Sequence, residues 1–116
     1  MKERNIVTLG LGWVISNDEV DEMREAAGCV WSEIEEYFMP IDPYADKTDY
    51  FLGFSMAPVE PGMALDLNKV AKTMSAEIDP NEFSNHFGHI ISMCGREVGP
   101  ESKWIEAQLY LISRFV

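Results

Sequence analysis

One long amphipathic segment in the first third of the chain limits the folds that this sequence can adopt. Ser16-Asn17-Asp18-Glu19 matches a capping box, in which the serine side chain accepts a hydrogen bond from the glutamate amide and the glutamate reaches back. Apolar residues then recur at steps of three and four until Pro40 ends the run, at Val20, Met23, Ala27, Val30, Ile34 and Tyr37. The pattern predicts one helix from Ser16 to Phe38 that buries this stripe and turns an acidic side to water.

Three other segments are typical of β-strands. Residues 6–15 place five large side chains on one face, namely Val7, Leu9, Leu11, Trp13 and Ile15. Residues 49–59 alternate in the same way, and a turn at 60–62 leads to a possible short return strand over 63–65. Residues 103–116 fit either a strand or a helix, and their β-branched and aromatic content toward the end favours a strand.

Two further helices are predicted between these strands. Asp66 can cap the first, and Asp79-Pro80-Asn81-Glu82 starts the second, which we expect to end near Gly95. The order of elements predicts an α+β two-layer sandwich, with two to three helices on one face of a mainly antiparallel sheet of three to four strands. A chain of 116 residues that is 47% hydrophobic can bury one core, so we expect a single domain over residues 1–116.

Charge is unevenly distributed along the chain. The net charge is −11, and residues 17–49 carry 11 acidic residues against 2 basic ones. This balance disfavours direct binding to nucleic acid or to an anionic membrane, because both attract cationic surfaces. An acidic patch can instead steer a cationic partner, although it can also serve only to keep a small protein soluble. For a basic protein partner, the expected binding residues are Asp18, Glu22, Glu25, Glu33, Glu36, Asp42 and Asp46.

Glycines make the second face of the first predicted strand small and flat. Gly10 and Gly12 both lie on it, which indicates that something bulky comes close there. A large aromatic side chain from a neighbouring strand is the simpler occupant. The alternative is a homo-oligomer that binds a small molecule at Gly10, Gly12 and Gly53, with Trp104 and Tyr110 as walls.

Glu82, His86 and His89 form a candidate metal site. Their spacing of four and three residues places them on one side of the predicted helix, and carboxylates and imidazoles ligate first-row metals. One helix supplies only three ligands, however, and Glu82 can simply pair with His86 across one turn. A metal-dependent enzyme is therefore the third hypothesis.

The two cysteines, Cys29 and Cys94, lack the spacing of a zinc ribbon or a redox pair, which favours reduced thiols and a cytoplasmic location. Glu25 and Glu33 flank Cys29, and Cys94 lies near a helix C-terminus, so we expect neither thiol to be activated. No stretch approaches the ~20 apolar residues that span a bilayer. The sequence thus favours a non-enzymatic acidic interaction protein without a cofactor, of the inhibitor, immunity or anti-defence type, that masks a basic surface.

Overall fold

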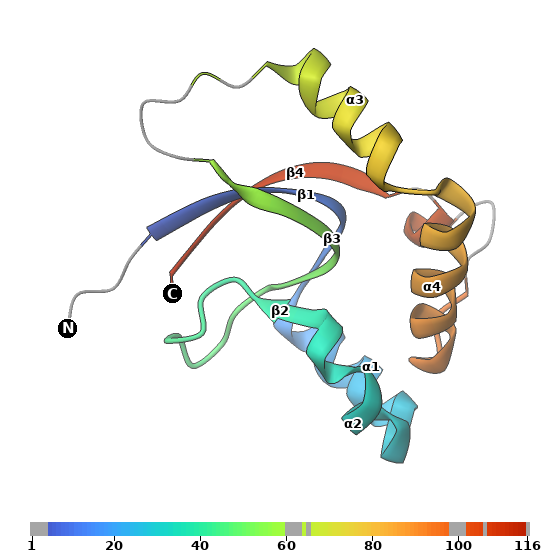
Figure 1. Ribbon diagram of the computed structural model, residues 1–116. Coiled ribbons are helices and arrows are strands. Elements are labelled where there is room, and N and C mark those ends of the chain that lie inside the picture. The colour runs from blue at the N-terminus through green and yellow to red at the C-terminus, as the bar shows by residue number, and fades with distance from the viewer. Residues whose placement is uncertain (1–4, 60–63, 65, 98–101, 106, 116) are drawn as a thin grey trace.

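Four antiparallel strands lie at the centre of the computed structural model, which describes residues 5–59, 64, 66–97, 102–105 and 107–115 (Figure 1). The sheet has the strand order β2-β3-β1-β4. The strands span Asn5–Ile15 (β1), Phe38–Pro40 (β2), Tyr50–Val59 (β3) and Gln108–Phe115 (β4). The α+β class is confirmed, and the ambiguous C-terminal segment forms a strand after a 3₁₀ turn at Lys103–Ile105. The possible strand over 63–65 lies outside the described residues, except for Ala64.

The helices are α1 (Asn17–Ala27), α2 (Trp31–Ile34), α3 (Leu67–Glu77) and α4 (Pro80–Met93). Three of these helices, α1, α3 and α4, begin where the sequence predicts, because a side chain caps each of these starts, whereas α2 begins without a side-chain cap. Ser16 Oγ accepts from the Glu19 amide at 3.2 Å. The Asp66 carboxylate accepts from two amides of α3, and that of Asp79 from two amides of α4. Among the described residues, no helix is both long and apolar enough to cross a membrane.

The prediction of one continuous helix from Ser16 to Phe38 is wrong. α1 ends at Ala27, and Gly28 adopts a φ of 60° while its amide donates to the Arg24 carbonyl. Glycine adopts this positive φ readily because it has no Cβ. A 3₁₀ turn at Gly28–Val30 leads into α2, and a second at Glu35–Tyr37 leads into β2. Figure 1 shows how the chain leaves the sheet along α1 and returns to it through α2.

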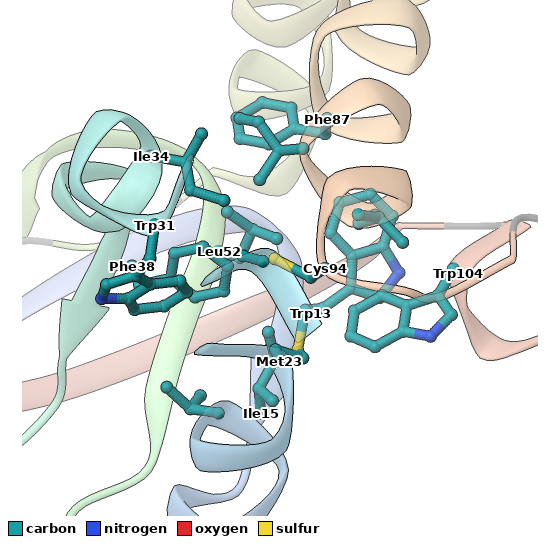
Figure 2. Close-up of a cluster of buried hydrophobic side chains, with 14 residues drawn as sticks. Trp13, Ile15, Met23, Trp31, Ile34, Phe38, Leu52, Phe87, Cys94 and Trp104 are labelled. Carbon is teal, nitrogen blue, oxygen red and sulfur yellow. The ribbon is translucent and has the colours of Figure 1, made fainter. Parts of the chain in front are cut away.

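The main core lies between one face of the sheet and helices α1, α2 and α4 (Figure 2). Trp13 on β1 is at its centre, with its ring centroid 5.9 Å from that of Trp104 and 6.2 Å from that of Phe87. The indole N–H of Trp13 donates a hydrogen bond to the Lys103 carbonyl at 3.0 Å. The same cluster contains Ile15, Val20, Met23, Ala27, Trp31, Ile34, Phe38, Leu52, Ile90, Ile91 and Cys94. The sheet and helices α1, α2 and α4 therefore share one apolar core. This core fixes the positions of the side chains on the outer surfaces of these helices.

β1 and β3 approach closely where two glycines face each other. Gly12 pairs with Gly53, and a Cβ built on Gly12 would lie 2.1 Å from the Leu52 carbonyl oxygen. A Cβ on Gly53 would lie 2.2 Å from the Leu11 carbonyl oxygen. The two glycines are thus required by the backbone crossing itself.

Candidate functional site

The glycine-bearing face of β1 is filled by the protein's own side chains. A Cβ on Gly10 would lie 2.6 Å from the Phe51 ring, which is 2% exposed. Tyr110 packs edge-on against the same ring, with ring centroids 6.3 Å apart. The gap above Gly10 is therefore occupied by an aromatic side chain from the neighbouring strand.

Trp104 and Tyr110, expected as two walls of one ligand site, do not come together. Trp104 belongs to the core cluster around Trp13, whereas Tyr110 contacts Phe51. Trp13 and Gly10 differ by an odd number of positions on β1 and so point to opposite faces of the sheet. The small-molecule hypothesis thus loses the geometry on which it depended.

One group of acidic side chains is neutralised within the protein, and we call it the paired face. Arg96 lies 3.4 Å from Glu19 and 3.0 Å from Glu22, and Lys103 also contacts Glu19. Asp21 pairs with Arg24 at 2.8 Å one turn along α1. Glu22, predicted as a binding residue for a basic partner, is paired with Arg96, which follows α4, while its side chain stays 71% exposed; its role in binding stays a prediction.

A second group of exposed acidic side chains has no ion pair within the part of the chain that the structure describes. We call these residues the unpaired face, although they are spread over α1, α2, the 3₁₀ turn after α2 and the loop between β2 and β3: Asp18, Glu25, Glu33, Glu35, Glu36 and Asp46. Four of these lie around the turn from α1 into α2 or in the 3₁₀ turn after α2. All of these residues except Glu35, which is adjacent to Glu36 in the chain, are predicted from the sequence as binding residues.

Asp42 is part of the loop between β2 and β3 and stabilises its conformation. Its carboxylate accepts from the Tyr44 amide at 3.2 Å, and its own amide donates to Thr48 Oγ1 at 2.8 Å. The side chain is half-buried rather than exposed. Asp42 therefore contributes charge near the unpaired face but is already engaged in a turn.

A cleft of about 540 Å³ lies between the α2 region and α4. Its lining residues are Glu33, Ile34, Tyr37, Glu82, Asn85, His86, His89, Ile90 and Met93. Tyr37 and His86 meet edge to face across it, with ring centroids 5.0 Å apart. The cleft thus joins the unpaired face to the three candidate metal ligands, which sequence reasoning had treated separately.

The candidate metal ligands do not form a metal-binding arrangement. Among the described residues, no group of three or more His, Cys, Asp or Glu side chains is placed to hold a metal ion. Glu82, His86 and His89 line the cleft but remain exposed on its rim. The hypothesis of a metal-dependent enzyme gains no geometric support here.

The two cysteines have different environments. Cys29 is exposed in the turn after α1, whereas Cys94 is buried. Burial raises the pKa of the Cys94 thiol above its ordinary value, and the nearby Arg96 cation partly opposes this effect. Cys94 is therefore a poor nucleophile.

No protein-family model, curated protein or solved structure matches this chain. The proposed function therefore depends on the surface and cleft just described.

Proposed function

We propose that this protein is a non-enzymatic acidic protein that binds and masks a basic surface of a protein partner, as inhibitors and immunity proteins do. The observation that carries the proposal is the division of the acidic side chains into a paired and an unpaired face. Arg96 and Lys103 neutralise Glu19 and Glu22, while Glu33 and Glu36 have no cation among the described residues.

The unpaired face provides a physical reason for a cationic partner to bind. Carboxylates without ion-pair partners keep their negative charge exposed, and a basic surface that replaces their mobile counterions is attracted over about one Debye length, or ~8 Å in physiological salt. Such attraction chiefly raises the association rate and selects the partner by charge. We place the protein in the cytoplasm on the basis of its two free cysteines.

The test compares two double variants that remove the same charge from different places. Glu33→Gln with Glu36→Gln reduces the unpaired face, and Glu77→Gln with Glu97→Gln removes two exposed carboxylates elsewhere. The probe is a lysine- and arginine-rich peptide, titrated at low and high salt. We expect the first variant to bind several-fold more weakly and with less salt dependence, and the second to bind like the original protein.

The natural partner can then be sought with the same pair of variants. The proposal is supported by a basic protein in host extract that binds the original protein and the Glu77/Glu97 variant. The same protein should fail to bind the Glu33/Glu36 variant. Equal loss in both variants would mean that total charge alone governs binding, and no loss in either would contradict the proposal.

Self-association is a second candidate function, and an exposed edge strand favours it. In the sheet that the structure describes, β4 has a neighbour on one side only, and Leu109 and Leu111 are 50% and 65% exposed. Residues 108–115 contain no acidic side chain, so two copies of this strongly acidic chain could meet there with little repulsion. Light scattering after gel filtration should then show a dimer that Leu111→Lys converts to a monomer; a monomeric original protein would exclude this candidate.

A further inference from the structure

The cleft between the α2 region and α4 combines an apolar floor with an acidic rim. Ile34 and Ile90 are buried at its base, and Met93 is half-buried beside them. Glu33 and Glu82 are exposed and come from two different helices. A ligand that fits this arrangement needs an apolar stem and a cationic end.

Aromatic side chains in the same cleft favour a ligand with a planar cationic group. Tyr37 is a partly exposed aromatic side chain, and it meets His86 edge to face. The face of an aromatic ring attracts a cation, and a planar guanidinium can also stack on it. Guanidinium is moreover less strongly hydrated than ammonium, so it loses less on leaving water.

The charge of the lining disfavours an anionic ligand. The lining residues include two carboxylates and neither a lysine nor an arginine. Its volume of about 540 Å³ also exceeds what one side chain needs, which leaves room for the peptide on either side of it.

We infer that this cleft receives an arginine side chain of the basic partner, with its methylene stem on Ile34, Ile90 and Met93 and its guanidinium between Glu33, Glu82 and the Tyr37 ring. The inference rests on the proposed function, and it gives the partner surface a defined centre. The surrounding unpaired carboxylates would then attract the partner, and the cleft would orient it.

The experiment titrates the full chain with the peptide acetyl-Gly-Arg-Gly-amide and follows NMR signals of the Met93 methyl group and the Tyr37 and His86 rings. A matched peptide carries citrulline in place of arginine, which keeps the shape and removes the charge. We expect saturable shifts of these signals with the arginine peptide and none with the citrulline peptide.

Variants separate the cleft from the rest of the acidic surface. Glu82→Gln should weaken arginine binding about threefold to fivefold, as expected for one partly exposed ion pair. Glu77→Gln removes the same charge from α3 and should leave the titration unchanged. Tyr37→Leu should weaken binding while keeping the net charge, because it removes only the aromatic face.

The outcomes distinguish this inference from the proposed function. If the basic peptide still binds through Glu33 and Glu36 but the arginine peptide leaves the cleft signals unmoved, the inference is overturned and the proposed function stands. If neither peptide binds, both fail. Tighter binding of agmatine than of the arginine peptide would assign the cleft to a free small amine and would also overturn the inference.

Discussion

The paired and unpaired faces have similar residues but opposite electrostatic surroundings. On α1, Glu19 and Glu22 face Arg96 and Lys103, which follow them by more than 70 positions in the chain. Around α2, Glu33 and Glu36 form no ion pair within the part of the chain that the structure describes, and the nearby Arg24 lies over the Trp31 ring instead. The difference shows that the helical periodicity of the sequence identifies which carboxylates are exposed. Tertiary contacts then decide which of these carboxylates remain available to a partner.

The largest expected effect comes from removing the shared support of both faces. Trp13→Ala should lower the free energy of unfolding by about 3–5 kcal/mol, because a central ring of the core and its bond to the Lys103 carbonyl are lost. Urea denaturation measures the change. Tyr44→Ala, at an exposed position in the loop between β2 and β3, is the control and should change stability by less than about 0.5 kcal/mol. A small effect at Trp13 would show that the two faces do not depend on this core.

The turn that separates the two faces should be the next most sensitive. Gly28→Ala places a Cβ on a residue with a φ of 60°, which should destabilise the protein by about 1–2 kcal/mol. No heavy atom lies within 4 Å of that Cβ, so the loss would report backbone strain alone. Gly88→Ala within α4 is the matched control, because it also meets open space but is helical and should stabilise by about 0.5–1 kcal/mol. Equal effects at the two positions would argue against the left-handed turn.

Much of the fold could be predicted from the sequence, and the exceptions have physical causes. The alternation of side chains along residues 6–15 and 49–59 predicted β1 and β3. Candidate capping side chains predicted the starts of α1, α3 and α4. The break at Gly28 was missed because Val30 and Ile34 continue the apolar spacing across it; glycine at a helix end was the available signal. The cleft was missed because Glu33 and Tyr37 come to line one cleft with Glu82 and His86 only after the chain has turned back toward the sheet.

The paired face can be converted into an unpaired one. Arg96→Gln should cost only up to about 1 kcal/mol of stability, because the ion pairs with Glu19 and Glu22 are partly exposed. The same variant should bind the basic peptide more tightly, since it frees Glu22 and leaves Glu19 paired with Lys103 alone. Lys72→Gln, which removes an exposed lysine of α3, controls for the change in net charge. Equal gains from both variants would show that the ion pairs on the paired face do not matter.

Burial of the Cys94 thiol predicts a small dependence of the free energy of unfolding on pH. Burial raises the pKa of Cys94 above its ordinary value near 9. The folded state therefore holds the thiol proton more tightly than the unfolded state, and this contribution is present below pH 9 and lost as the pH rises through the folded-state pKa. The stability of Cys94→Ala should fall less between pH 9 and pH 10 than that of the original protein.

A thiol reagent should modify Cys29 alone in the native protein and both cysteines after unfolding.

The most direct test of the unpaired face is to map the basic peptide onto the unaltered protein by the shifts of its backbone amide NMR signals. We expect the shifted signals to concentrate in residues 33–36 and at Glu25 of the unpaired face, with residues 82–89 shifting as well where the cleft takes part, and the shifts to shrink as salt is added. Shifts centred on Glu19 and Glu22, or spread evenly over all acidic residues, would contradict it.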